Sequence, residues 1–329
     1  MSLLFYLLVF LLVLIVSSTT NKLLPFLPMP LIQILLGIGI GLCLPNNQYH
    51  LDTELFLALV IGPLLFREAQ EADITSILKH WRIVLYLIFP VIFISALSMG
   101  GVAHVLWATL PLAACVAVGA ALGPTDLVAF ASLSQRFSFP KRVSNILKGE
   151  GLLNDASGLV AFRMALIAWT TGTFSLTQAG TSLAISIVGG FAVGFITALI
   201  NRFLHTFLLS VRATDIASEL LLELSLPLLT FFIAEEIHVS GIIAVVVAGI
   251  LKASRFKKIN LLEAQVDTVT ETVWHTVTFM LNGSVFVILG MELEMIAEPI
   301  LKSAFYSKVL LLLSVFLLTF LLFAIRFVM

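Results

Sequence analysis

The stretch that decides the fold is 143–170, VSNILKGEGLLNDASGLVAFRMALIAWT, an apolar run with Glu150, Asp155 and Arg163 inside it. A run of this length spans the hydrocarbon core of a bilayer as a helix, which needs about 20 residues. Each charge at the membrane centre costs about 2.5–3.5 kcal/mol on insertion scales, so such charges mark functional sites. We therefore expect a membrane helix whose buried charges carry the activity.

The composition of the whole chain agrees with this expectation. Of the 329 residues, 60% are hydrophobic and only 11% are charged, whereas soluble domains have about 25% charged residues. These values exclude a soluble enzyme, a disordered chain and a collagen-like chain. The net charge of -1 gives no field that would attract nucleic acid. We expect an all-α, polytopic protein of the lipid bilayer, with no nucleic-acid partner, no enzymatic activity and no cofactor.

The apolar runs predict eleven transmembrane helices. The first run lacks a basic segment before it and a small-residue cleavage site after it, so we interpret it as a retained helix and not a signal peptide. The expected helices are 2–18, 23–44, 54–67, 82–100, 104–134, 143–170, 182–209, 217–236, 239–252, 272–291 and 306–329.

The basic residues predict how these helices are oriented. Fourteen of the 18 lysines and arginines lie in the odd-numbered loops, and only Lys302 and Lys308 lie in even-numbered ones. Cytoplasmic loops carry the excess of basic residues, so the odd loops are predicted to be cytoplasmic and the N-terminus external. Glu68 follows Arg67 on the cytoplasmic side and is a candidate for the ion path.

Charges on three of the expected helices balance almost completely. From the helical rise of 1.5 Å per residue, Glu150 lies roughly 10 Å and Asp155 roughly 18 Å below the cytoplasmic face. Arg326, in the eleventh helix, reaches a depth at which it can pair with Glu150. With Asp126 and Arg163, these groups leave one negative charge in excess. One spare carboxylate in a buried site favours one monovalent cation, either a proton or a metal ion.

The fifth expected helix is interrupted at Gly123 and Pro124, directly before Thr125 and Asp126. Proline has no N–H and leaves the carbonyl four residues earlier, that of Ala120, without its helical partner. Transporters use such breaks to offer carbonyls to cations at the bilayer midplane. The break therefore predicts an ion site and not a simple kink.

Three functions remain open on these residues alone. The first is a secondary antiporter in which a proton and a cation compete for Asp155. The second is a channel or a non-transporting ion or pH sensor, although no filter-like loop or charged ring is visible. The third is an intramembrane aspartyl protease in which Asp126 and Asp155 form the dyad, although the G-x-G-D element of such enzymes is missing. The charges can also be purely structural, with Asp155 protonated.

Four segments resemble motifs of one transporter family. Residues 123–129, GPTDLVA, resemble the P-T-D-x-V-A signature of sodium/proton antiporters, and 149–156, GEGLLNDA, resemble their G-E-S-x-x-N-D signature. Residues 238–244, HVSGIIA, and 62–68, GPLLFRE, resemble two further motifs in the family's order. The chain thus resembles the NhaP-type cation:proton antiporters. Gly151 stands where the signature has serine, so one possible oxygen ligand is missing.

The resemblance assigns roles to particular residues. It implies that Asp155 carries the transported sodium ion or proton and that an Asn-Asp pair goes with electroneutral, one-for-one exchange. The sodium ion, or another monovalent cation, is thus a substrate and not a structural metal. The implied cation- and proton-binding residues are Asp155, Thr125, Asp126 and Asn154, and the implied structural ion pair is Glu150 with Arg326.

The resemblance also implies an architecture of thirteen helices in inverted repeats, with two unwound helices that cross, and a homodimer. On this basis 1–329 is one transmembrane exchanger domain. Residues 1–171 form the first repeat, 182–209 a linker helix and 217–329 an incomplete second repeat. The last two helices of the family fold are then missing, so we expect these 329 residues by themselves to be inactive.

Overall fold

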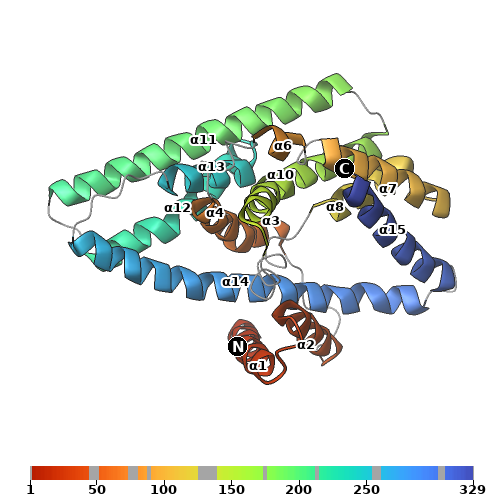
Figure 1. The fold of residues 1–329 in the computed structure, drawn as a ribbon, viewed down its shortest axis with the longest axis horizontal. Coiled ribbons are helices and arrows are strands. Elements are labelled where there is room, and N and C mark those ends of the chain that lie inside the picture. Colours follow the sequence, from red (N-terminus) through yellow and green to blue (C-terminus); the bar gives the residue numbers. More distant parts are fainter. Residues whose placement is uncertain are drawn as a thin grey trace. The chain divides into compact units, whose positions relative to one another are not determined.

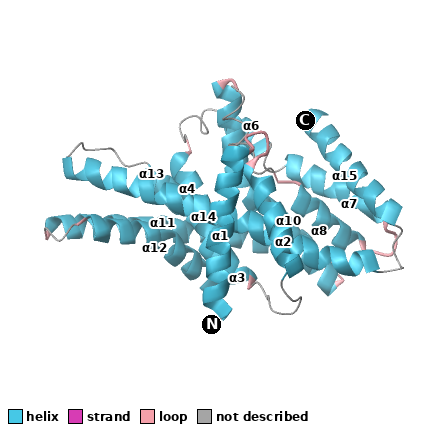
Figure 2. Cartoon of the chain, turned by 90° about the horizontal axis from the view of Figure 1, so that it is seen from below, coloured by secondary structure: helices cyan, strands magenta, loops and turns pink. Residues whose placement is uncertain are grey.

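The structure, a computed structural model, is helical throughout the part of the chain that it describes. Helices joined by turns and loops make up this part, and no strand occurs in it (Figure 2). The predicted all-α membrane fold is therefore confirmed. The described residues are 2–43, 52–72, 81–86, 90–124, 139–172, 176–211, 215–253, 261–302 and 308–328.

The chain forms two compact units, each built from segments that are distant in sequence. The first unit contains Met1–Arg67, Leu199–Leu229 and Arg255–Phe305. Its main contact is between α2 and α14, and α1 packs on α2. Its α-helices are labelled in Figure 1, and the unit also contains a short π-helix, η1 (Leu57–Ile61). The α-helices are α1 (Ser2–Leu23), α2 (Met29–Cys43), α3 (Thr53–Phe56), most of α4 (Gly62–Glu71), α14 (Leu261–Lys302), the end of α11 (Leu176–Ser210) and most of α12 (Ile216–Glu236).

The second unit contains Glu68–Ala198, Thr230–Ser254 and Tyr306–Met329. At its centre α8 packs on both α7 and α10 through the small buried residues Ala96, Ala120 and Ala161. Its helices include α6 (Trp81–Tyr86), α7 (Ile92–Leu106), α8 (Leu112–Leu122), α10 (Lys141–Thr171), α13 (Gly241–Ala253) and α15 (Lys308–Val328).

Each predicted transmembrane run overlaps a helix of the described chain, but several boundaries differ from the prediction. The predicted break after residue 100 does not occur, because α7 continues to Leu106 and α8 begins only after Pro111. The predicted helix 272–291 is the central part of α14, which has 42 residues. Polar residues do not end α14, since the Thr272 hydroxyl donates to the Thr268 carbonyl of the same helix at 2.9 Å.

Several described helices have the composition and surface of membrane spans. By length and composition, three are sufficient to cross a bilayer: Ala184–Ser210, Ile216–Glu236 and Thr268–Leu293. Other apolar helices in the described part are shorter. Large apolar side chains face outward, and Phe320 and Phe323 of α15 are each 72% exposed. Such surfaces are stable in lipid and unstable in water.

Polar side chains inside the apolar helices find partners on neighbouring helices. The Thr230 hydroxyl of α12 donates to the Thr197 hydroxyl of α11 at 3.0 Å, and both residues are buried. Nearer the other end of these helices, His205 Nε2 lies 3.0 Å from Glu219 Oε1. Because lipid offers no hydrogen bonds, such contacts between helices satisfy groups that would otherwise be costly.

Glycines allow two helix pairs to approach until their backbones touch. A Cβ atom on Gly37 of α2 would lie 2.3 Å from the Val287 carbonyl oxygen of α14, and one on Gly290 would lie 2.2 Å from the Ile34 carbonyl oxygen. On α11, a Cβ atom on Gly194 would lie 2.2 Å from the Ala244 carbonyl oxygen of α13. Close packing through small residues is typical of membrane helices.

We expect Gly37→Ala to lower the thermal unfolding temperature in detergent, because the added methyl group meets a backbone carbonyl that cannot move aside. Overpacking of this kind costs about 1–3 kcal/mol. Gly39 of the same helix is the matched control, since a Cβ atom there meets nothing within 4 Å. Gly39→Ala should leave the temperature unchanged or raise it, because alanine favours helix. Equal effects of the two substitutions would show that α2 and α14 do not meet at Gly37.

Candidate functional site

The helix that carries most of the predicted site is continuous. α10 begins after Pro140 and runs without interruption to Thr171. It ends at Gly172, which has φ 68°, a left-handed conformation that glycine adopts without strain. Within this helix Glu150 is buried, with 1% exposure. A buried carboxylate requires a charged or hydrogen-bonding partner.

Arg326, near the end of α15, provides that partner. Its Nη1 donates to Glu150 Oε1, and its Nη2 donates to the Gly123 carbonyl oxygen at 2.9 Å. The Glu150 side chain is 2% exposed and that of Arg326 20%. The structure therefore brings the two residues of the predicted pair together. The bond to the Gly123 carbonyl was missed, because a backbone acceptor leaves no mark in the sequence.

The predicted interruption lies where the described part of α8 ends. α8 stops at Leu122, and Gly123 and Pro124 form a bend. Gly158 of α10 packs against this bend, since a Cβ atom on Gly158 would lie 2.3 Å from Pro124 Cγ. α8, α10 and α15 therefore meet at one point of the second unit. We call Gly123, Glu150 and Arg326 the arginine node.

The remaining predicted residues are placed only in part. Thr125 and Asp126 lie outside the described residues. Asn154 and Asp155 belong to α10, four and five residues after Glu150, but their side chains lie outside the described part. Glu68 belongs to α4 and is half-buried. Their roles in ion binding stay predictions.

The predicted motif at 238–244 forms a tight turn between α12 and α13. His238 has φ 58°, which is uncommon for a residue other than glycine. Ser240 precedes α13, and its hydroxyl oxygen accepts the Ile243 N–H at 3.2 Å, while Glu235 Oε1 accepts the Gly241 N–H at 3.3 Å. These bonds satisfy N–H groups of the first turn, which have no partner inside the helix. Residues of the motif thus cap the start of α13.

An aromatic contact joins α4 to α14 in the first unit. Trp274 and Phe66 are completely buried, and their ring centroids are 6.0 Å apart. The guanidinium carbon of Arg67 also lies 6.0 Å from the Trp274 ring centroid, at the outer limit of a cation–π interaction. Sequence reasoning missed this contact, because it joins residues more than 200 positions apart.

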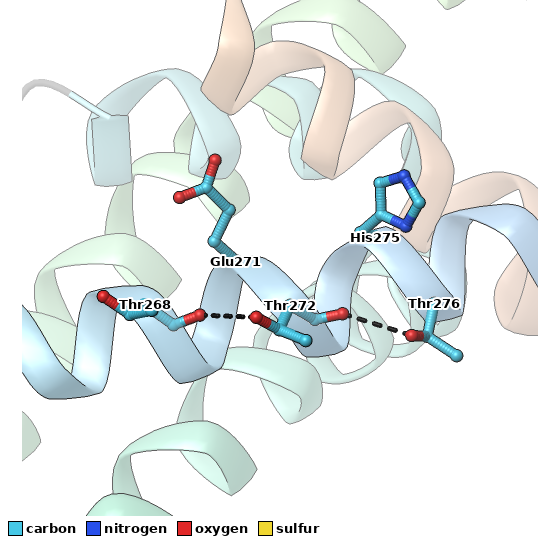
Figure 3. Close-up of a pocket in the computed structure, with 5 residues that line it drawn as sticks. All are labelled: Thr268, Glu271, Thr272, His275 and Thr276. Carbon is cyan, nitrogen blue, oxygen red and sulfur yellow. Dashed lines mark hydrogen bonds between the residues drawn. The ribbon is translucent and has the colours of Figure 1, made fainter.

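A groove of about 300 Å³ lies along one face of α14. Its residues follow helical spacing, and Figure 3 shows the Glu271 and His275 side chains projecting from the helix. The Thr276 hydroxyl donates to the Thr272 carbonyl at 3.2 Å, so this hydroxyl is used by the helix itself. The groove offers one carboxylate and one imidazole, and the i, i+4 spacing is the signal that could have found it. Its lining residues are Thr268, Glu271, Thr272, His275 and Thr276.

Apolar spans and a buried ion pair at a helix end define a polytopic membrane protein with charges in its core. The family model described as "Sodium/hydrogen exchanger, transmembrane" matches residues 7–329. The chain therefore belongs to the sodium/hydrogen exchanger family. This assignment confirms the resemblance of the sequence motifs to those of NhaP-type sodium/proton antiporters.

Curated relatives are antiporters and exchangers. The chain is 36% identical over 321 residues to the sodium, potassium, lithium and rubidium/H(+) antiporter of Bacillus subtilis, covering 97% of this chain and 48% of that protein. It is 32% identical over 309 residues to the uncharacterized Na(+)/H(+) exchanger YjcE of Escherichia coli, covering 92% and 56% respectively. The chain thus spans about half the length of the curated relatives it matches.

A solved structure has the same fold. The sodium proton antiporter MjNhaP1 of Methanocaldococcus jannaschii, determined at pH 8, matches with a TM-score of 0.66 and 19% identity. The match covers 88% of this chain and 71% of that one. This likeness supports an NhaP-type antiporter fold for the described helices.

Proposed function

We propose that the protein exchanges protons for monovalent cations across a cell membrane, with one proton and one cation competing for Asp155. The observation that carries the proposal is the family match over residues 7–329, with Asp155 in the helix that contributes Glu150 to the arginine node. The relatives are transport proteins by name. The family assignment lends no support to the protease or to the channel.

The chemistry follows from a single carboxylate that both substrates need. A protonated Asp155 is neutral and cannot hold a cation, whereas an ionised Asp155 in a low-dielectric site requires one. Each cycle therefore moves one proton against one cation, and no net charge crosses. Thr125 and Asp126 provide further oxygen atoms after the bend at Pro124, while Asn154 positions its neighbours. Rocking of one helix bundle against another then exposes the site to each side in turn.

Three further features belong to this proposal. The positive-inside pattern supports an external N-terminus and cytoplasmic odd-numbered loops, and it puts Glu68 on the cytoplasmic ion path. The division into repeats 1–171 and 217–329 around a linker at 182–209 fits two-bundle rocking. A homodimer is expected from the resemblance to the family.

Transport assays with the product of the complete reading frame test the proposal. The protein is reconstituted into vesicles that contain a pH-sensitive dye, and sodium, potassium, lithium or rubidium is added in turn, since the Bacillus antiporters are named for these ions. We expect at least one cation to drive proton movement at a rate that does not depend on the membrane potential. Failure of all four cations would refute antiport, and a rate that follows the potential would refute one-for-one exchange.

A further inference from the structure

We propose that Arg326 is a positioning residue that holds the end of α8 in place, and that its bond to the Gly123 carbonyl does this separately from its pairing with Glu150. The guanidinium donates to two acceptors on two different helices, Glu150 Oε1 on α10 and the Gly123 carbonyl oxygen after α8. It therefore joins α15 to both of them.

The end of α8 needs such a partner. The last carbonyls of a helix have no donor within the helix, and Pro124 has no N–H to offer the Ala120 carbonyl. The C-terminus of a helix also carries partial negative charge, which a nearby cation stabilises. Arg326 supplies a permanent positive charge and a hydrogen bond of 2.9 Å at this point.

Arginine is suited to this role in a way that lysine is not. The planar guanidinium presents several donors in a fixed fork, whereas the lysine ammonium is a single point charge on a flexible chain. Arg326 uses Nη1 for one helix and Nη2 for the other. Its Nε is buried and meets no acceptor among the described residues. A lysine at this position keeps the charge beside Glu150 but cannot hold both acceptors in the same geometry.

The consequence for function follows from chain continuity. Gly123 is two residues before Thr125 and three before Asp126, the proposed cation ligands. Gly158 of α10 packs closely against Pro124. Loss of the bond to Gly123 therefore releases the chain directly before these ligands. This consequence depends on the proposed function, whereas the role of Arg326 in fixing α8 does not.

Hydrogen exchange measured by mass spectrometry on the last turn of α8 tests the positioning role directly. We expect Arg326→Lys to raise exchange of these amides about tenfold or more, because local opening controls their exchange. Glu150→Gln keeps a neutral acceptor for Arg326 and leaves the bond to the Gly123 carbonyl. In this variant the amides of the last turn of α8 should therefore exchange at nearly the wild-type rate. The double variant Glu150→Gln/Arg326→Gln leaves no unpaired charge, so it should fold more readily than a variant that keeps one. The amides of the last turn of its α8 should exchange as fast as those of the Arg326→Lys variant.

Transport kinetics of the complete gene product supply the second readout. Arg326→Lys should raise the KM for sodium about tenfold and reduce the maximal rate less, because the cation ligands are displaced. If the amides at the end of α8 exchange as slowly as in the wild type in both the lysine variant and the double variant, the positioning role is wrong even if the protein transports. If α8 exchanges fast but no variant or wild type transports, the positioning role stands and the proposed function fails.

Discussion

We expect Asp155→Asn to abolish cation-driven proton movement in vesicles while the protein stays folded. Asparagine has nearly the same shape as aspartate, but its amide neither takes up a proton as a carboxylate does nor carries the negative charge that a cation requires. Because both substrates of the exchange need this one carboxylate, the rate should fall to that of protein-free vesicles. The measurement is the initial rate of dye dequenching after a sodium pulse, at saturating sodium.

Asp215→Asn is the matched control for this substitution. Asp215 is exposed at the start of α12, and its Oδ1 accepts the Ser218 N–H at 2.8 Å. Asparagine caps a helix as well as aspartate does, so this variant should transport like the wild type. Thermal unfolding of both variants in detergent checks that they are folded. Full exchange by a folded Asp155→Asn protein would remove Asp155 from the mechanism.

Glu150→Ala should destabilise the protein strongly. It removes the carboxylate that pairs with the Arg326 guanidinium and leaves that charge partly buried. Removing one member of a buried ion pair costs about 3–5 kcal/mol, and the cost here is somewhat less because the Arg326 side chain is 20% exposed. The measurement is the unfolding temperature in detergent, together with the yield of monodisperse protein.

Glu236→Ala, at the exposed end of α12, controls for the loss of one glutamate and should change the unfolding temperature little. The double variant Glu150→Ala/Arg326→Ala should be more stable than the sum of the two single losses predicts, because it leaves no unpaired charge. If Glu150→Ala were as stable as Glu236→Ala, the arginine node would not contribute to the fold.

The sequence was most informative where one physical effect dominates. Apolar runs long enough to span lipid predicted the helices, because an α-helix satisfies all its backbone hydrogen bonds within one segment. The depth of Glu150 and Arg326 could be counted from the helical rise, so their pairing was predicted from residues far apart. Gly123 and Pro124 predicted the end of α8, because proline removes a helical hydrogen bond.

Other features could not be predicted, because they depend on how particular helices meet. The Gly123 carbonyl is a backbone acceptor that every residue possesses, so only its position beside α15 makes it a ligand of Arg326. The contact of Arg67 and Phe66 with Trp274 requires the crossing of α4 and α14. The length of α14 was underestimated, because threonines that bond to their own helix look like loop residues in a hydropathy profile.

The central claim is that a proton and a cation occupy Asp155 in turn, and the pH dependence of the KM for sodium tests it most directly. The complete gene product is assayed in vesicles at a series of pH values, with sodium varied at each. Simple competition predicts that the KM for sodium rises about tenfold for each pH unit of acidification, at pH values where Asp155 is mostly protonated in the absence of sodium. The maximal rate at saturating sodium should be unchanged. A KM that is independent of pH, with a maximal rate that falls on acidification, would contradict competition at a shared carboxylate.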